Sequence, residues 1–259
     1  MIDDRRSLPL AGRRALVTGG ASGIGAATVR ALADRGAHVL VADRDREAAT
    51  ALAVEVGGAT WVVDLLEPDA LEPDRLAEIL SPVDILVNNA GVQSIGPIQD
   101  FDPADFRRIL TLMLEVPFLL VRSALPHMYA RGFGRVINVS SVHGLRASAF
   151  KSAYVAAKHG LEGLSKVTAL EGGPHGVTSN CVNPGYVRTP MVERQIADQA
   201  AVHSIPESEV LSRVMLTESA IKRLVEPAEV ASLVGWLASD DAGMVTGASY
   251  AMDGGWSAR

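Results

Sequence analysis

Short apolar runs alternate along the chain with longer segments in which apolar residues recur every three or four positions. The runs are rich in Val, Ile and Leu, which is typical of buried strands, and we expect strands at residues 14–18, 38–43, 60–64, 84–88, 135–140, 178–182 and 248–252. The longer segments have the period of a helix and lie at 25–35, 46–56, 69–80, 103–131, 152–171 and 227–239. This alternation predicts an α/β fold, a doubly wound parallel sheet of about seven strands with right-handed crossovers and helices on both faces.

The composition predicts one domain over residues 1–259. Hydrophobic residues make up 48% of the chain, which is enough to fill a large core. The sequence contains no linker-like or low-complexity stretch and no fixed-period repeat that would mark a second unit. A net charge of -6 without a block of Lys or Arg argues against nucleic acid and against an anionic membrane surface as partners.

Targeting and metal-binding patterns are also missing from the sequence. The first residues do not form the apolar core of a signal peptide, and about 18 uninterrupted apolar residues, enough to span a membrane, occur nowhere. We therefore expect a soluble, cytoplasmic protein. The single cysteine, Cys181, excludes an internal disulfide, supplies no metal cluster and is typical of a small buried hydrophobe.

A glycine-rich turn joins the first expected strand to an Ala-rich helix. Thr18 ends the strand, and Gly19, Gly23 and Gly25 follow in the spacing G-x-x-x-G-x-G. In such a turn the backbone N–H groups and the helix dipole bind a dinucleotide pyrophosphate, and the glycines allow the phosphate to approach closely. The alternative is a plain strand-to-helix connection. The rest of the sequence favours a cofactor.

Asp43 ends the second expected strand, where a carboxylate accepts hydrogen bonds from the adenosine ribose. The same carboxylate would repel a 2′-phosphate, so the sequence favours NAD over NADP. The neighbouring Arg44 leaves NADP open, because an arginine can bind a 2′-phosphate. Alternatively, Asp43 only caps the helix that starts near Asp45.

The segment 140–160 contains the most reactive combination of side chains. Tyr154 and Lys158 stand one helical turn apart, so both project from the same face of the predicted helix. A lysine cation beside a phenol favours the phenolate, and we expect it to lower the tyrosine pKa toward the working pH. Ser141 follows a buried strand and can hold a substrate oxygen. The alternative is a packed tyrosine with a solvated lysine.

Residues 18–25, 88–91 and 184–185 together with Ser141, Tyr154 and Lys158 resemble, in order and spacing, the short-chain dehydrogenase/reductase family. The resemblance covers nearly the whole chain and implies a Rossmann-like sheet, a nicotinamide cofactor, Ser–Tyr–Lys catalysis and a homotetramer. It divides the domain into a cofactor half, about 1–135, and a catalytic and substrate half, about 136–259. The cofactor residues that it implies are Thr18, Gly19, Ser22, Gly23, Ile24, Gly25, Asp43, Asp64, Leu65, Asn89, Ala90, Gly91, Tyr154, Lys158, Pro184, Gly185, Val187 and Thr189. Among them, Thr189 would contact the nicotinamide carboxamide and Lys158 the nicotinamide ribose.

Met113 departs from the family pattern, which usually has an Asn at this position of the long helix. The family's Asn is thought to support a water that leads protons to the lysine, and methionine cannot make its hydrogen bonds. Pro117, four residues later, removes a helical N–H and is expected to interrupt the helix, leaving the Met113 carbonyl as a candidate water ligand.

Within the family, residues 143–160, 165–171, 184–196 and 253–259 resemble bacterial D-3-hydroxybutyrate dehydrogenases most. The resemblance implies that Gln93, His143, Lys151 and Gln195 grip a small carboxylate and that Tyr186 forms a pocket wall where that group more often has Trp. Cations and neutral donors suit such a substrate, since it offers little apolar area. Alternatively, Lys151 is solvated and His143 closes a turn. Gln195 belongs to a segment near 190–215 that we expect to act as a lid.

The sequence therefore predicts a reversible, NAD-dependent hydride transfer between (R)-3-hydroxybutyrate and acetoacetate, with Tyr154 as general base and acid. Two alternatives remain. One is a family member that acts on another alcohol, such as a 3-oxoacyl carrier reductase or a sugar or steroid dehydrogenase. The other is an NAD-binding protein that has lost catalysis through Met113.

Overall fold

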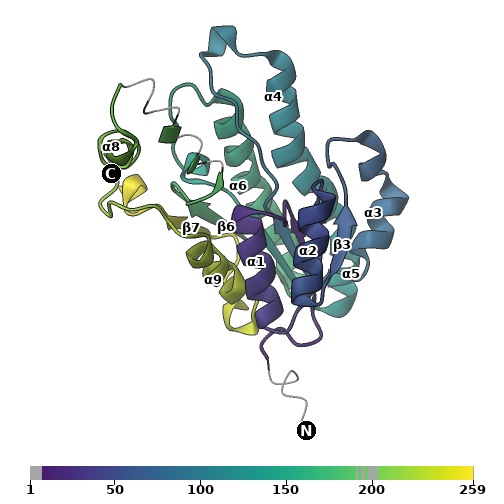
Figure 1. The fold of residues 1–259 in the computed structure, drawn as a ribbon. Helices are drawn as coiled ribbons and strands as arrows, with labels where there is room; N and C mark the ends of the chain where they lie inside the picture. Colours follow the sequence, from purple (N-terminus) through teal and green to yellow (C-terminus); the bar gives the residue numbers. More distant parts are fainter. Residues whose placement is uncertain (1–7, 191, 194–195, 198–199, 201–203, 259) are drawn as a thin grey trace.

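The computed structural model describes residues 8–190, 192–193, 196–197, 200 and 204–258. One seven-stranded sheet with the order β3-β2-β1-β4-β5-β6-β7 forms the centre of the molecule, and every neighbouring pair of strands is parallel (Figure 1). The strands are β1 (Arg14–Thr18), β2 (His38–Asp43), β3 (Ala59–Val62), β4 (Ile85–Asn88), β5 (Gly134–Val139), β6 (Val177–Pro184) and β7 (Ser249–Met252). The predicted doubly wound α/β fold is confirmed.

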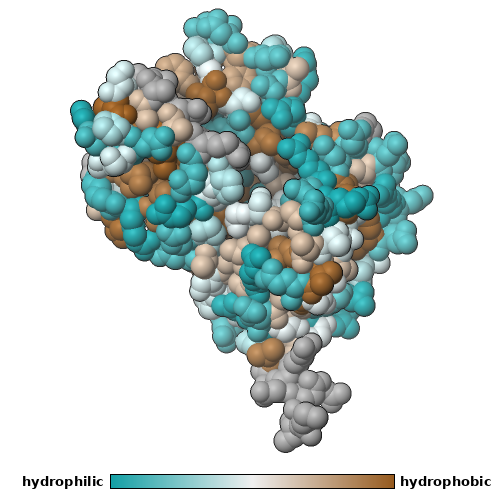
Figure 2. Space-filling view, viewed as in Figure 1, coloured by the Kyte–Doolittle hydropathy of each residue, from teal (hydrophilic) through white to brown (hydrophobic). Residues whose placement is uncertain are grey.

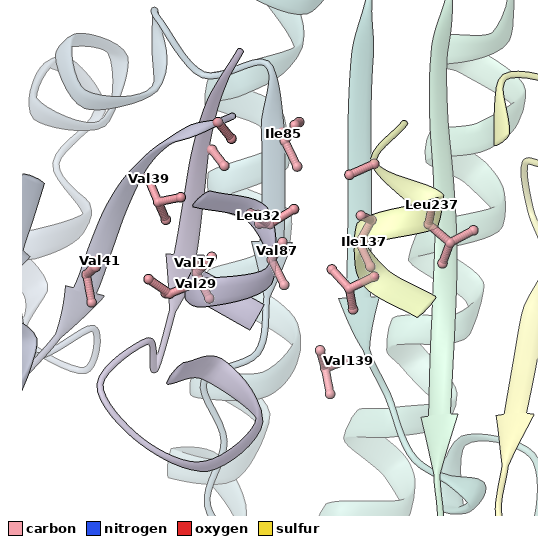
Figure 3. Packing of buried hydrophobic residues seen from close by; sticks show 14 of the residues in the cluster. Val17, Val29, Leu32, Val39, Val41, Ile85, Val87, Ile137, Val139 and Leu237 are labelled. Carbon is pink, nitrogen blue, oxygen red and sulfur yellow. The ribbon is translucent and has the colours of Figure 1, made fainter. Parts of the chain in front are cut away.

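Helices cover both faces of the sheet, because its central strands have apolar side chains on both sides that need to be shielded from water. One face packs against α1 (Gly23–Asp34), α2 (Arg46–Val56) and α9 (Pro227–Leu237). The other packs against α3 (Pro73–Leu80), α4 (Pro103–Leu110), α5 (Val116–Arg131) and α6 (Ser152–Gly172). Figure 3 shows the first layer, where Val29 and Leu32 of α1 and Leu237 of α9 lie over the strand residues.

The sequence-predicted boundaries differ from the structure mainly around residues 59–80. The third strand ends at Val62, because Asp64 turns the chain by accepting a hydrogen bond from the backbone N–H of Leu66. The predicted helix 69–80 is two elements, a 3-10 turn at Pro68–Leu71 and α3. Pro73 causes the break, since a proline forces the residue before it, Glu72, into an extended conformation.

A π-helical turn, Thr111–Glu115, joins α4 to α5. At its end the N–H of Val116 bonds to the carbonyl of Thr111, which confirms the interruption that Pro117 predicts. The helical run 103–131 is long and apolar enough to cross a membrane by length and composition alone. Its apolar residues include Ile109, Met113 and Leu120, each at most 1% exposed, so this composition is also that of a core helix.

The strand order reverses between β1 and β4, which leaves a crevice at the carboxyl ends of these strands. The turns after β1 and β4 line it from opposite sides, and the segment after β5 follows on the β4 side. On the face seen in Figure 2, apolar residues are interspersed among hydrophilic ones around the central hollow. The fold thus brings the turns that the sequence singled out to one edge of the sheet.

Candidate active site

Thr18 and Asn89 fasten the glycine-rich turn to the turn after β4. The Thr18 hydroxyl accepts hydrogen bonds from the N–H groups of Asn89, at 3.0 Å, and Ala90, at 3.1 Å. The Asn89 side chain donates in turn to the carbonyls of Thr18, at 2.9 Å, and Gly19, at 3.0 Å. Both residues therefore shape the crevice through bonds within the protein.

The glycines of the first turn are required by backbone conformation and by space. Gly19 and Gly23 have φ values of +61° and +51°, in the left-handed region. A Cβ on Gly25 would lie 2.0 Å from the carbonyl oxygen of Gly19, so only glycine lets the helix start against the turn. A Cβ on Gly23 would meet the Thr189 methyl group at 3.2 Å, which places Thr189 beside this turn.

The start of α1 suits an anion. Within the described chain, the side chain of Ser22 makes no capping hydrogen bond and the first turn contains no acidic residue. The N–H groups and the positive end of the helix dipole are thus directed at the crevice without a side-chain acceptor. The turn and helix fit the pyrophosphate of a dinucleotide, which supports this part of the sequence prediction.

Asp43 connects the end of β2 to the glycine-rich turn. One carboxylate oxygen accepts a hydrogen bond from the N–H of Ala21 and the other from the N–H of Asp45, both at 3.0 Å. Asp45 caps α2 by accepting from the N–H of Ala48. The alternative in which Asp43 only caps this helix is therefore wrong, and its carboxylate lies at the cofactor edge of the sheet.

The remaining residues expected to bind the cofactor differ in the burial of their side chains. Leu65 and Val187 have core side chains, 5% and 4% exposed, so they can reach a cofactor only through their backbone. Ile24 is half-buried, and Pro184 and Gly185 lie at the end of β6. Roles in cofactor binding stay predictions for these residues, as for Asp64, Ala90 and Gly91.

Ser141, Tyr154 and Lys158 come together at the carboxyl end of β5. Ser141 is extended, precedes the 3-10 turn η5 (Val142–Gly144) and accepts a hydrogen bond from the N–H of His143 at 3.2 Å. Tyr154 is hydrogen-bonded to the Ser141 side chain. The Lys158 ammonium lies 5.7 Å from the centre of the Tyr154 ring and donates to the carbonyl of Val139 at 2.7 Å. The reading with a packed tyrosine and a solvated lysine is wrong, because Lys158 is only 4% exposed.

The pKa shifts at this triad are dominated by burial. Burial raises the pKa of Tyr154, and the hydrogen bond with Ser141 offsets only part of that rise. Burial lowers the pKa of Lys158 to about 8. The net direction for Tyr154 is opposite to the one expected from its lysine neighbour, because removing the phenolate from water outweighs attraction to the cation. The phenol is therefore in its acid form at neutral pH.

His143 and Lys151 form the second part of the site. The Lys151 ammonium lies 3.0 Å from Nε2 of His143 and 5.8 Å from the centre of the Tyr186 ring. Burial, with smaller contributions from the charges of Lys151 and His159, lowers the pKa of His143 to about 4, so its ring is neutral and Nε2 accepts from Lys151. Burial lowers the pKa of Lys151 too. Lys151 is half-buried against His143, so the solvated-lysine alternative is wrong, whereas His143 does lie in the turn after β5.

The pair lies directly beside the catalytic triad. The rings of His143 and Tyr154 are in edge contact, with centroids 6.1 Å apart. Nδ1 of His143 is buried without a hydrogen-bond partner among the residues that the structure describes. Lys151 and His143 therefore supply a cation and a neutral imidazole at hydrogen-bonding range of one another, next to Tyr154.

The structure describes one of the two glutamines that we expect to bind the substrate carboxylate. Gln93 is half-buried in the loop after β4, and that loop is fixed to the segment before Lys151 by a hydrogen bond from Gly96 to the Phe150 carbonyl, at 2.9 Å. Gln195 lies outside the described residues. The expected lid falls partly outside them as well, and its described end contains α8 (Glu207–Val210) and a π-helical turn, Leu211–Met215.

Comparison with known proteins places this geometry in a family. A family profile described as enoyl-(acyl carrier protein) reductase matches residues 19–257. The structure also superposes on a solved short-chain dehydrogenase/reductase family protein with a TM-score of 0.86 and 34% identity, over 97% of this chain and 100% of the other. The chain belongs to the short-chain dehydrogenase/reductase family.

Several curated relatives in this family are similar over nearly their full length. D-beta-hydroxybutyrate dehydrogenase from Rhizobium meliloti (strain 1021) is 44% identical, over 95% of this chain and 99% of the relative. The enzyme of the same name from Cupriavidus necator is 42% identical, over 96% and 100%. A 3-alpha-(or 20-beta)-hydroxysteroid dehydrogenase from Mycobacterium tuberculosis is 37% identical, over 95% and 90%. The chain is thus an oxidoreductase of this family that acts on alcohol groups.

Met113 has a packing role in this short-chain dehydrogenase/reductase. It is 1% exposed, and its thioether lies against Gly91, where an added Cβ would be 3.4 Å from the methionine methyl group. A water held by the Met113 carbonyl stays a prediction.

Three residues around the site were not predicted from the sequence: Trp256, Glu162 and Asn183. The Trp256 ring makes an edge contact with His143, with centroids 5.8 Å apart, so Trp256 packs beside the Lys151–His143 pair. Glu162 and Asn183 form a buried network beneath Ser141. The signal for Glu162 was in the sequence, since it follows Lys158 at the same spacing that separates Tyr154 from Lys158.

Proposed function

We propose that this protein catalyses the reversible, NAD-dependent oxidation of (R)-3-hydroxybutyrate to acetoacetate. The observation that carries the proposal is the Lys151–His143 pair beside Tyr154 and Ser141. The Lys151 cation suits a small carboxylate, whereas a purely apolar alcohol would supply no anion to that charge, which lies beside the neutral ring of His143. The relatives named D-beta-hydroxybutyrate dehydrogenase support the same substrate class.

Each residue of the site has a defined task in this reaction. A bound nicotinamide supplies the hydride acceptor for oxidation and the hydride for reduction. Tyr154, in its acid form, donates a proton to the carbonyl oxygen of acetoacetate during reduction and takes it back from the hydroxyl during oxidation. The Ser141 hydroxyl holds the reacting oxygen. Lys158 provides positive charge for the phenolate that forms, and Lys151 with His143 binds the carboxylate.

NAD is the proposed cofactor because the carboxylate of Asp43 is held at the end of β2 by the N–H groups of Ala21 and Asp45. A fixed negative charge there repels a 2′-phosphate. A solved relative contains the other nucleotide: the structure of a putative 2-deoxy-D-gluconate 3-dehydrogenase from Agrobacterium tumefaciens has bound NADP. That structure is 30% identical, with a TM-score of 0.83, over 96% of this chain and 98% of the other.

The proposed function is tested by following NADH formation with a panel of alcohols and with both nucleotides. The panel holds 3-hydroxybutyrate, longer 3-hydroxy acids, a sugar acid, cyclohexanol and a hydroxysteroid. The highest kcat/KM is expected for 3-hydroxybutyrate with NAD. A higher value for cyclohexanol or the steroid would contradict the substrate assignment, and a higher value with NADP would contradict the cofactor assignment.

Replacing Lys151 with Met removes the charge and keeps the length of the side chain. We expect the KM for 3-hydroxybutyrate to rise about 100-fold, because a charge-assisted bond to a partly buried carboxylate is worth about 3 kcal/mol. Cyclohexanol, which has no carboxylate, serves as the control substrate. An unchanged KM for the hydroxy acid would remove Lys151 from the substrate site.

Self-association is a further part of the proposal. Apolar residues of the α4–α5 run and of α6 line a groove of about 590 Å³, formed by Arg107, Leu110, Thr111, Leu114, Glu115, Phe118 and Leu164. Phe118 is 48% exposed in the single chain. Arg107 and Glu115 in the lining of the groove have charges of opposite sign, so an antiparallel second copy could bring unlike charges together. We propose that this surface contributes to a homotetramer.

A further inference from the structure

Glu162 is a buried carboxylate on the catalytic face of α6. It follows Lys158 by one helical turn, as Lys158 follows Tyr154, so the three side chains form one row along the helix. Glu162 is 4% exposed. Burying a carboxylate is expensive unless hydrogen bonds and a neighbouring cation compensate for the lost water.

Hydrogen bonds connect this carboxylate to the backbone of Ser141. One oxygen of Glu162 accepts from the side-chain amide of Asn183 at 2.5 Å, and the other accepts from the hydroxyl of Ser249 at 2.6 Å. The same Asn183 amide also donates to the carbonyl of Ser141 at 2.9 Å. Glu162 therefore orients the side chain that holds Ser141 in place.

The carboxylate also packs against the turn that carries His143. A Cβ on Gly144 would lie 2.8 Å from Oε1 of Glu162 and 2.5 Å from the Ser140 hydroxyl. Glycine at position 144 thus allows η5 to approach Glu162 closely. The approach ties the position of η5, and with it His143, to the carboxylate.

Electrostatics connect Glu162 to Lys158. Burial lowers the pKa of Lys158 to about 8, and negative charge at Cys181 or Glu162 opposes this fall. The third titratable neighbour, Tyr154, is in its acid form because burial raises its pKa. Burial likewise raises the pKa of Cys181, so that side chain is a neutral thiol at neutral pH. Glu162 is then the anion that favours the charged form of Lys158.

We propose that Glu162 is a positioning residue of the active site: it supports the positive charge of Lys158 and, through Asn183, fixes the backbone of Ser141. The proposal rests on the proposed function for the catalytic roles of Ser141, Tyr154 and Lys158. Glu162 itself touches neither substrate nor cofactor in this assignment.

The charge on Lys158 can be measured without substrate or cofactor. The chain has four lysines, at positions 151, 158, 166 and 222, so carbon-labelled lysine gives a simple NMR spectrum, and Lys158→Met assigns the signal. The Lys158 signal is followed through a pH titration in the wild type, in Glu162→Gln and in Ser249→Ala. Gln keeps the size of Glu and can still bond to Asn183 and Ser249, but it carries no charge.

We expect the pKa of Lys158 to fall by about one pH unit in Glu162→Gln, because only the charge has been removed. Ser249→Ala is the matched control, since it removes one hydrogen bond of the same carboxylate and leaves the charge, and the Lys158 titration should stay at the wild-type value. If Glu162→Gln does not fold, Glu162→Leu, which is also uncharged and of similar size, is titrated instead. An unchanged Lys158 titration in the uncharged variant would overturn this half of the proposal.

Steady-state kinetics test the other half, with the alcohol that the wild type oxidises fastest. Asn183→Ala breaks the link to Ser141 without removing a charge. We therefore expect kcat to fall about tenfold or more, while the alkaline limb of the kcat pH profile stays at the wild-type pH. In Glu162→Gln the alkaline limb should move to lower pH together with the Lys158 titration. NADH affinity, circular dichroism and the melting temperature report on general damage. Wild-type kcat in Asn183→Ala would overturn the link between Glu162 and Ser141.

The two proposals fail in different ways. If the wild type oxidises no alcohol in the panel, the proposed function is wrong, while the lysine titration still decides whether Glu162 supports the charge on Lys158. If the wild type is active and the titrations and kcat values of all variants match it, the function stands and the role of Glu162 is wrong.

Discussion

At the scale of single residues, burial decides the chemistry of the site more than pairwise attraction does. Tyr154 and Lys158 are adjacent, yet burial moves the pKa of the phenol up and that of the ammonium down. Both shifts favour neutral groups, as expected when charges leave water. The surrounding hydrogen bonds, from Ser141 to Tyr154 and from Lys158 to Val139, are what hold the pair in a reactive arrangement.

Tyr154→Phe removes the proton donor and leaves the ring in place. We expect turnover to be abolished in both directions, because no other group bonded to Ser141 in the described structure can exchange a proton with the substrate oxygen. NADH binding, measured by fluorescence titration, should remain within about twofold of wild type. Appreciable turnover by the variant would refute Tyr154 as the acid and base.

The wild-type pH profiles should differ for the two directions. Because the pKa of Tyr154 is raised, the acid form needed for reduction predominates at neutral pH, and the base form needed for oxidation increases with pH. Below the pH at which Lys158 loses its charge, oxidation should therefore accelerate as the pH rises and reduction should slow. Initial rates of both reactions across the pH range measure this, and parallel profiles would contradict the assignment.

His143 makes the protein sensitive to acid. Its pKa in the folded protein is about 4, against 6.5 for an exposed histidine, so between these values the unfolded chain binds a proton that the folded protein does not. The free energy of unfolding should fall as pH drops through this window, by up to about 1.4 kcal/mol per pH unit from this residue. In His143→Gln the fall should be shallower, as measured by urea unfolding at several pH values. An equal slope in both proteins would show that His143 takes up its proton at the same pH in the folded and unfolded states.

At the scale of elements, two turns and the start of one helix build the cofactor crevice. The turn after β1 and the turn after β4 hold each other through Thr18 and Asn89, and Asp43 fixes the first turn to β2. Three neighbouring strands thus contribute to one rigid edge. The start of α1 then faces this edge with its N–H groups.

Gly25→Ala tests how closely α1 must approach the turn. The added methyl group would lie 2.0 Å from the Gly19 carbonyl, so the turn has to move, and we expect a loss of about 2 kcal/mol in the free energy of unfolding and at least a tenfold weaker affinity for NADH. Gly163→Ala in α6 is the matched control, since an added Cβ meets no described atom within 4 Å, and it should stabilise the protein by about 0.5–1 kcal/mol. Chemical unfolding and NADH titration measure both variants. Equal behaviour of the two would show that the turn tolerates a side chain.

At the scale of the whole molecule, the sheet and its two helical layers place the site at one edge and leave the α4–α5 and α6 surface partly uncovered. The groove on this surface combines exposed Phe118 with flanking charges of both signs. A surface of this kind is consistent with contact between copies of the chain.

Phe118→Lys should weaken self-association, because a second copy would have to bury the added charge. Light scattering coupled to size exclusion should show smaller species at a given concentration than for wild type. Val54→Lys is the control, since Val54 is 77% exposed on α2, on the opposite helical layer, and its variant should keep the wild-type mass. A Phe118→Lys protein of unchanged mass would place the interface elsewhere.

The sequence by itself determined the elements and the local motifs, because these depend on near neighbours in the chain. Apolar periodicity predicted the sheet, Pro117 predicted the interruption that became a π-helical turn, and the spacing of Tyr154 and Lys158 placed them on one face. Pro73 shows the limit of periodicity, since one residue split a segment whose apolar pattern continued through it.

Only the tertiary structure decided the properties that depend on burial and on distant parts of the chain. The direction of the Tyr154 shift, the neutral ring of His143, and the link from Glu162 through Asn183 to Ser141 join residues from different elements. Dehydration and hydrogen bonding of this kind arise when strands and helices pack together, and no local pattern encodes them.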